Sequence, residues 1–241
     1  MPNILGINLS ADNEKTALKK VEEFLNSNSF HYAVTPNPEI ILRAQIDADF
    51  WQILNQADLS LADGFGLKIA GWLSKQKITR ITGSDFSLKI LKLASEKNKK
   101  VVIINWEKGL STREEIKEAL EKKYPGLNFL VINAARATNL EPEEQVLLTT
   151  FAPDIVFSAL GFPYQEKIIF NNKENWPSVR LALGVGGTFD FITKKATRAP
   201  KIMRRVGLEW LWRLGKQPQR LGRIYRATFV FMAKILFKKH K

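Results

Sequence analysis

The apolar residues of the chain fall into short runs that alternate with segments of helical periodicity. The runs are rich in β-branched residues and nearly continuous, which is typical of strands that are buried on both faces. They span residues 4–9, 31–35, 59–63, 100–105, 127–133, 154–160 and 179–186. Between them, residues 14–27 and 84–96 place apolar side chains three or four positions apart, as in amphipathic helices. This alternation predicts an α/β fold over residues 1–193, with a doubly wound, mostly parallel sheet and helices on both faces.

The pattern changes after residue 193, where basic residues interleave with bulky apolar ones. Residues 194–241 hold 15 Lys and Arg against one acid, a net charge of +14, whereas residues 1–193 hold 22 against 23, a net charge of −1. The excess of +13 for the whole chain therefore belongs to this segment, which we predict to be a basic, amphipathic helical appendage. Its apolar stretches are far shorter than the roughly 18 residues that cross a bilayer. The first 15 residues lack the basic region of a signal peptide, so we do not expect export.

The composition limits the chemistry that the chain can perform. It has no cysteine and only two histidines, His31 and His240. Disulfide frameworks, zinc sites, thiol nucleophiles and Ser-His-Asp triads therefore lack their parts. Any acid or base catalysis has to come from carboxylates.

Ligands of parallel sheets bind outside the carboxyl ends of the strands, so we sought candidate chemistry there. Asp63 ends the run 59–63 and is followed by Gly64, which leaves a carboxylate at the sheet edge that could accept a proton from a substrate hydroxyl. The alternative is a helix N-cap. Asn37 would lie beside Asp63 if the strands 31–35 and 59–63 are neighbours, and otherwise it is a turn residue.

A second candidate is the turn before the helix predicted at 84–96. Arg80 precedes Thr82-Gly83-Ser84-Asp85, and the N-terminus of a helix can hold an anion through its free N–H groups. A helix start capped by Gly83 or Ser84 explains the turn equally well, but it does not explain Arg80.

Two further motifs resemble cofactor sites only superficially. Gly184-Val-Gly186-Gly187 follows a strand but lacks the third glycine of a dinucleotide fingerprint, so it indicates either close approach of a phosphate or sugar or a tight turn. Asp47-Ala-Asp49 matches the DxD motif of metal-dependent glycosyltransferases, but it lies in a helical stretch, where a solvated helix face is the better interpretation.

The arginines of the appendage could neutralise phosphates on nucleic acid or on lipid. Bulky apolar residues close to the C-terminus favour an interfacial helix over a groove-binding one. The alternative is a helix that packs its apolar face on the core. The residues concerned are Arg213, Arg220, Arg223, Arg226, Phe229, Phe231, Leu236 and Phe237.

Taken together, these motifs resemble the WecG/TagA/CpsF glycosyltransferase family. The similar stretches run in family order over most of residues 30–225: TPNPE (35–39), ADLSLADGFG (57–66), RITGSD (80–85), YPGL (124–127), LGFPYQE (160–166), GVGGTFDF (184–191), RAP (198–200), GLEWLWRL (207–214) and PQRLGR (218–223).

The resemblance implies an inverting enzyme at the cytoplasmic side of the membrane that requires no metal or other cofactor. It would move an N-acetylmannosamine-type sugar from UDP to an undecaprenyl-pyrophosphate-linked sugar, in cell-surface polysaccharide or teichoic-acid-type synthesis. The appendage would dock on the anionic membrane surface.

The resemblance also implies roles for individual residues. Asp63 would be the base, and the diphosphate would meet Arg213, Arg220 and Arg223. The reaction pocket would be lined by Thr35, Asn37, Arg80 and Gln165. The turns at the strand ends add further candidates for substrate binding, namely Gly83, Ser84, Asp85, Gly161, Gly186 and Gly187.

Two positions depart from the family pattern. Trp106 follows Ile104-Asn105 where members usually have two glycines, and Thr193 replaces a glycine before the RAP motif. We expect Trp106 to block or reshape part of the nucleotide cleft.

Two rival functions remain at this point: a nucleic-acid-binding protein that uses the basic appendage, and a nucleotide-dependent oxidoreductase. Neither predicts the full set of motifs at the strand ends, so we expect a UDP-sugar and a lipid-linked acceptor as partners and no nucleic acid. The sequence leaves open whether the chain forms a homo-oligomer.

Overall fold

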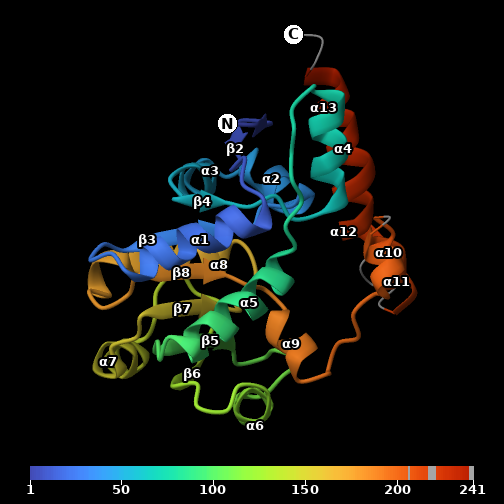
Figure 1. The fold of residues 1–241 in the computed structure, drawn as a ribbon. Helices are drawn as coiled ribbons and strands as arrows, with labels where there is room; N and C mark the ends of the chain where they lie inside the picture. The colour runs from blue at the N-terminus through green and yellow to red at the C-terminus, as the bar shows by residue number, and fades with distance from the viewer. Residues whose placement is uncertain (206, 217–220, 239–241) are drawn as a thin grey trace.

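The computed structural model describes residues 1–205, 207–216 and 221–238, and these form an α/β fold around one parallel sheet (Figure 1). The sheet has six strands in the order β4-β3-β8-β7-β5-β6, each parallel to its neighbours. The strands are β3 (His31–Val34), β4 (Leu59–Ser60), β5 (Val101–Trp106), β6 (Phe129–Ala134), β7 (Ile155–Ser158) and β8 (Leu181–Gly184). The predicted fold class is confirmed.

Helices cover both faces of the sheet, as the alternation of strand side chains requires. Along β5, Val102 and Ile104 point into one apolar cluster, whereas Val101 and Ile103 point into the other. The first cluster is closed by α2 (Pro38–Ala44), α3 (Ala48–Asn55) and α8 (Tyr164–Asn172), the second by α1 (Glu14–Leu25), α5 (Gly83–Glu96) and α6 (Arg113–Lys123). The remaining helices of this part are α4 (Phe65–Leu73), α7 (Pro142–Phe151), the 3₁₀ turn η1 (Lys173–Asn175) and α9 (Thr188–Ile192).

The register of the central strands brings their carboxyl ends to one edge. Val34 pairs with Ser60, and Ser158 pairs with Gly184. The segments that follow β3, β4, β7 and β8 therefore leave the sheet side by side, which is where the candidate site lies.

The prediction of one strand over residues 4–9 is wrong. These residues form an antiparallel hairpin outside the main sheet, from β1 (Asn3–Ile4) and β2 (Ile7–Asn8). Leu5 and Gly6 both have positive φ, 50° and 85°, as a two-residue turn of type I′ requires. The chain therefore reverses within the apolar run.

The C-terminal segment is helical, as predicted. It comprises α10 (Lys201–Arg205), α11 (Glu209–Lys216), α12 (Leu221–Tyr225), the π-helical turn η3 (Arg226–Val230) and α13 (Phe231–Lys238). In Figure 1, α13 lies beside α4, and its end projects beyond the body of the sheet. No helix in these described stretches has the length and apolar content needed to cross a bilayer.

Candidate functional site

Asp63 lies where the chain leaves β4, between the ends of β3 and the start of α5. Its backbone N–H donates to the Pro36 carbonyl (2.8 Å), and its Oδ2 accepts from the Gly83 N–H (3.2 Å). The helix that follows is capped by Gly64 with φ of 104°, so Asp63 is not its N-cap. The half-buried carboxylate is instead held at the first turn of α5, facing the strand ends.

Asn37 lies beside this turn, as predicted from the pairing of β3 with β4. A Cβ added at Gly64 would come within 3.7 Å of the Asn37 Cβ and 3.2 Å of the Pro38 Cδ, so the two turns approach closely because Gly64 has no side chain. The Asn37 Oδ1 accepts from the Ile40 N–H (3.0 Å) and caps α2. Asn37 is therefore both a helix cap and a neighbour of the Asp63 turn.

The start of α5 packs directly on the end of β3. A Cβ at Gly83 would lie 3.0 Å from the Thr35 Oγ1, so only glycine allows this contact without a shift. The Ser84 hydroxyl accepts from the Thr188 hydroxyl (3.2 Å), which links α5 to α9. The expected cap at Gly83 or Ser84 is wrong, because Thr82 is the N-cap of α5.

Arg80 and Asp85 hold the C-terminal segment on the core. The Arg80 guanidinium donates to the Arg204 carbonyl (2.6 Å) and to the Glu209 carboxylate (3.3 Å). The Asp85 carboxylate accepts from the guanidinium groups of Arg198 (2.5 Å) and Arg204 (3.1 Å). The two residues that we predicted to serve a ligand at α5 thus also hold Arg198, Arg204 and Glu209.

Gln165 bridges the ends of β7 and β8. It is the second residue of α8, and its Oε1 accepts from the Gly186 N–H (2.9 Å) while its Nε2 donates to the Glu166 Oε1 (2.7 Å). A Cβ at Gly184 would lie 2.4 Å from that Nε2, so the side chain crosses the strand where glycine leaves room. Gly187 is the N-cap of α9, which explains the glycine pair as a turn.

Glu166 is a buried carboxyl beside Gln165, and the sequence analysis assigned it no role. It is 1% exposed, and its Oε2 has no hydrogen-bond partner among the described residues. Burial raises the pKa of Glu166 to about 7. Its position next to Gln165 was visible in the sequence, but its burial was not.

Sequence reasoning also missed Arg136, which follows β6. Its guanidinium lies 3.5 Å from the centre of the Trp106 ring, and its Nε donates to the Leu160 carbonyl (2.7 Å). A Cβ at Gly161, where φ is 78°, would lie 3.3 Å from the Arg136 Nη2. Applying the rule on strand ends to the segment after residue 133 would have found it.

Arg223 reaches the same edge from α12. Its Nε and Nη2 donate to the two carboxylate oxygens of Glu39 (2.8 and 2.9 Å), and its guanidinium lies 5.7 Å from the centre of the Phe162 ring. The ion pair with Glu39 raises the pKa of Arg223, whereas burial lowers the pKa of Arg136 and the charge of Arg223 lowers it further. Two guanidinium groups are therefore close enough to repel each other.

The other two predicted arginines cannot be placed. Arg220 and the side chain of Arg213 lie outside the described residues, so their roles stay predictions.

The DxD candidate lies on the α2–α3 connection. Asp47 caps α3 by accepting from the Phe50 N–H, and it pairs with Lys167 (3.0 Å) and Arg43 (3.2 Å). Burial would raise the pKa of Asp47, but the bond from Phe50 and the pair with Lys167 outweigh it and lower the pKa. Within the described part of the chain, no three His, Cys, Asp or Glu residues form a group that could hold a metal ion.

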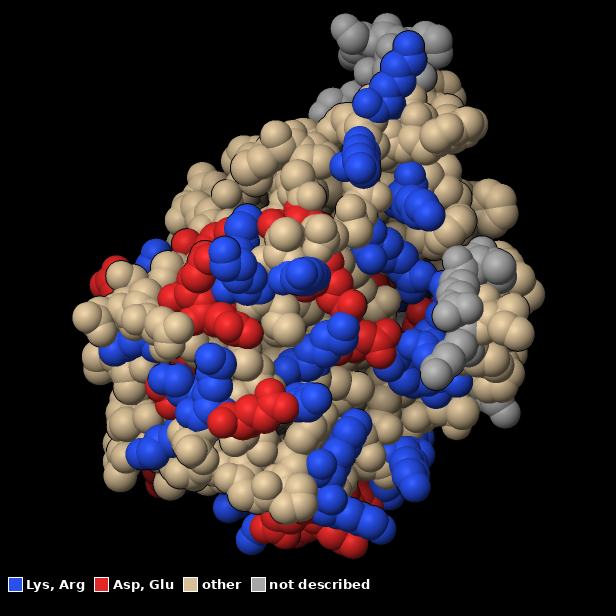
Figure 2. All heavy atoms as spheres, in the orientation of Figure 1, with Lys and Arg blue, Asp and Glu red and all other residues tan. Residues whose placement is uncertain are grey.

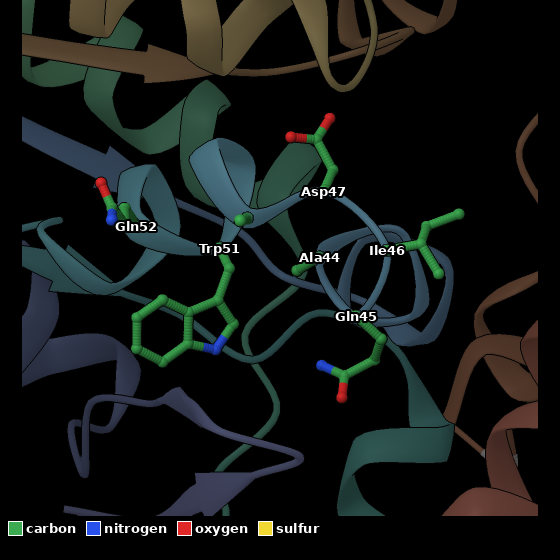
Figure 3. Close-up of a pocket in the computed structure, with 7 residues that line it drawn as sticks. Ala44, Gln45, Ile46, Asp47, Trp51 and Gln52 are labelled. Atoms are coloured by element: carbon green, nitrogen blue, oxygen red, sulfur yellow. The ribbon is translucent and has the colours of Figure 1, made fainter.

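A hollow of about 490 Å³ lies at the same connection, next to Gln45, Ile46 and Trp51 (Figure 3). Asp47 of the DxD candidate lines it, but none of the residues expected in the reaction pocket does. It is separate from the candidate site at the strand ends.

Comparison with known proteins gives the chain a family. The family model "Glycosyl transferase WecG/TagA/CpsF family" matches residues 2–241. Two similar proteins, from Staphylococcus aureus strains MRSA252 and MW2, are named N-acetylglucosaminyldiphosphoundecaprenol N-acetyl-beta-D-mannosaminyltransferase. Each is 30% identical over 243 and 246 residues respectively, which is 99% of this chain and 93% of the relative. The resemblance seen in the motifs is therefore confirmed, and the chain belongs to the WecG/TagA/CpsF family of glycosyltransferases.

Proposed function

We propose that the chain transfers an N-acetylmannosamine-type sugar from a UDP donor to an undecaprenyl-diphosphate-linked sugar, with inversion and without a required metal. Such a product belongs to cell-surface polysaccharide or teichoic-acid-type synthesis. The names of the relatives support the donor sugar and the acceptor. The observation that carries the proposal is the Asp63 carboxylate, held at the start of α5 among the turns that follow β3 and β4.

Asp63 is the base of the proposed reaction. The acceptor hydroxyl attacks the anomeric carbon of the donor, the new C–O bond forms, and the bond from that carbon to the UDP phosphate oxygen breaks. Asp63 accepts the proton of the hydroxyl, and the electron pair of the broken bond leaves with UDP. The Gly83 N–H donates to one carboxylate oxygen and so holds the Asp63 carboxylate at the strand ends. Asn37, whose cap uses its oxygen, contributes its amide N–H groups to the substrate.

Arginines at the same edge balance the charge of the departing diphosphate. Arg136 contacts Gly161, and Arg223 faces the ring of the next residue, Phe162. Their mutual repulsion falls when a diphosphate lies between them, and guanidinium groups bind phosphate oxygens through paired N–H donors. Trp106 stacks on the Arg136 guanidinium and fixes its position. We propose that Trp106 reshapes the nucleotide cleft in this way. Arg213 and Arg220 would add to this charge.

The appendage of residues 194–241 docks this catalytic unit on the inner face of an anionic membrane. Its net charge of +14 and the exposed Phe229 and Phe237 support this role. The alternative of a helix packed on the core holds for part of the segment, because Phe231 is fully buried and Ile235 nearly so.

A turnover screen tests the proposal. The purified chain is incubated with a series of UDP-sugars and a lipid-diphosphate-linked N-acetylglucosamine analogue, and the extended acceptor is measured by mass spectrometry. We expect UDP-N-acetylmannosamine to give product and its stereoisomers to give little. Absence of product with every UDP-sugar, together with tight binding of RNA, DNA or NAD, would refute it.

A further inference from the structure

Helix α4 exposes large apolar side chains although its other face is part of the core. Leu67 and Ala70 are fully buried, whereas Trp72 is 78% exposed and Ile69 is 36% exposed. Ile69 and Trp72 are three positions apart, so they lie on the same side of the helix and form a small apolar patch. The transferase site does not explain it, because α4 leads away from Asp63.

Helix α4 lies next to the end of the chain. A Cβ at Gly66 would lie 3.9 Å from the Ala227 carbonyl oxygen and from the Phe231 ring, so the first turn of α4 touches the start of α13. From there the two helices run side by side in the same direction to the projecting tip (Figure 1). The exposed Leu236 and Phe237 lie in the last turns of α13.

The N-terminal hairpin joins this tip. The Asn3 backbone N–H donates to the Gln76 side chain (2.6 Å), and the Gln76 Nε2 donates back to the Asn3 carbonyl (3.1 Å). This pair fixes the hairpin to the loop that follows α4, and the exposed Met1 begins it. Three segments far apart in the sequence therefore bring apolar side chains to one end of the molecule.

The charges of these segments have one sign. Residues 64–84 contain four Lys and Arg and no acid, although residues 1–193 as a whole are balanced, and residues 221–238 also contain four and no acid. Lys68, Lys75 and Lys234 form no ion pair within the described residues. Figure 2 shows Lys and Arg without Asp or Glu over the projecting tip.

We propose that α4, α13 and the N-terminal hairpin form one docking face for an anionic lipid bilayer, with Trp72 as its anchor in the catalytic part of the chain. The pattern of separate apolar side chains among unpaired lysines suits the headgroup region, where Trp and Lys are both stable. A second copy of the same face is disfavoured, because a symmetric contact would oppose like charges. This inference rests on the proposed function, whose acceptor is lipid-linked, and it adds the orientation of the enzyme.

The orientation follows from the length of α4. Trp72 lies nine residues after Asp63, and a helix rises about 1.5 Å per residue, so the anchor lies at most on the order of 13 Å from the base along the α4 axis. An appendage attached at its C-terminus alone would leave this distance variable. Anchoring α4 as well holds Asp63 at a height that a membrane-bound diphosphate sugar can reach.

Single labelled cysteines test the proposal on the full chain, which has none of its own. Ile69→Cys and Phe237→Cys report on the two helices, and Leu147→Cys on the exposed face of α7, at the opposite end of the molecule in Figure 1, is the control. Each is labelled with an environment-sensitive fluorophore and mixed with phosphatidylglycerol-containing or pure phosphatidylcholine vesicles. We expect a blue shift at positions 69 and 237 on anionic vesicles only, and none at 147. A blue shift at position 237 on anionic vesicles without one at position 69 would overturn the proposal. So would a blue shift at position 69 that appears without lipid when the protein concentration is raised.

Substitutions measure how much each part contributes. Trp72→Ser should weaken binding to anionic vesicles about ten-fold, whereas Leu147→Ser should not change it. The pair Lys68→Gln and Lys75→Gln should weaken binding about five-fold per lysine, against no change for Lys117→Gln with Lys122→Gln on α6. Equal effects of the test and control pairs would overturn the role of α4.

Turnover separates this inference from the proposed function. All these variants should keep wild-type activity on a short-chain, water-soluble acceptor, and the α4 variants should lose activity only on acceptor embedded in vesicles. Failure of the wild type on the soluble acceptor would refute the transferase itself. Full activity of Trp72→Ser on embedded acceptor would refute the docking of α4 alone.

Discussion

Replacing Glu166 by Gln tests whether this buried carboxyl is protonated in the folded protein. Its side chain is 1% exposed, one oxygen accepts from Gln165, and the other has no partner among the described residues. Burial raises its pKa from 4.5 to about 7. Glutamine has the shape of the protonated acid and never ionises, so it isolates the free energy of ionisation.

The sign and size follow from the two pKa values. Between about pH 4.5 and 7 the folded chain holds a proton that the unfolded chain has released, so the stability from this group is complete below pH 4.5 and is lost as the pH rises through 7. A difference of about 2.5 pKa units corresponds to about 3 kcal/mol. Glu166→Gln should therefore match the wild type at pH 4.5 and exceed its free energy of unfolding by about 3 kcal/mol at pH 8.

Urea unfolding followed by tryptophan fluorescence at several pH values measures this difference. Tyr32, the titratable neighbour on β3, stays neutral throughout because burial and the Glu166 charge raise its pKa. Glu174→Gln on the exposed turn η1 is the control and should follow the wild-type curve. A difference between Glu166→Gln and wild type that does not change with pH would refute the reasoning.

Three further predictions concern the site. Asp63→Asn should lower turnover 10²–10⁴-fold. Folding and UDP affinity should stay intact, because the new amide oxygen can still accept from the Gly83 N–H. A loss of only two-fold in the steady-state rate would contradict the role of Asp63 as base. Chelator should leave turnover unchanged, since Asp47 is held by a helix cap and ion pairs, and activity that vanished with EDTA and returned with Mn²⁺ would contradict this. Arg136→Ala should weaken UDP binding by calorimetry on the order of ten-fold, because it removes a charge-assisted hydrogen bond, whereas Arg113→Ala on α6 should not; equal affinities would exclude Arg136 from the diphosphate site.

The strands of the main sheet were predictable because their apolar runs indicate that both of their faces are buried. Continuous apolar runs such as those of β5 and β7 can be satisfied only between two layers of helices. The hairpin at residues 3–8 was not predictable in this way. Its turn places Leu5 at positive φ, and it is stabilised from outside, by the Gln45 side chain on the Leu5 carbonyl and the Asn55 side chain on the Gly6 carbonyl.

In the candidate site, too, some residues were predictable from the sequence and others were not. Asp63 and Asn37 were predicted to be neighbours because strand pairing fixes backbone positions, and the backbone alone brings them together. Arg136 was missed because a long side chain is positioned by what it touches, here a ring on β5 and a carbonyl beyond β7. Arg80 lies 124 residues from the carbonyl that it contacts, a partner that no local pattern could indicate.

The number of Lys and Arg residues in the appendage does not show that all of them have the same function. Asp85 pairs with Arg198 and Arg204, and Glu39 pairs with Arg223. The two acids lie in the first turns of α5 and α2, where their negative charge also complements the helix dipoles. These pairs hold the segment over the strand ends and leave its guanidinium groups beside the site. Arg226 of η3 and Lys234 of α13 form no ion pair within the described residues, so their charge stays available outside the core. One basic segment thus separates into a part that attaches to the catalytic core and a part that faces away from it, and the division is set by where the core places its acids.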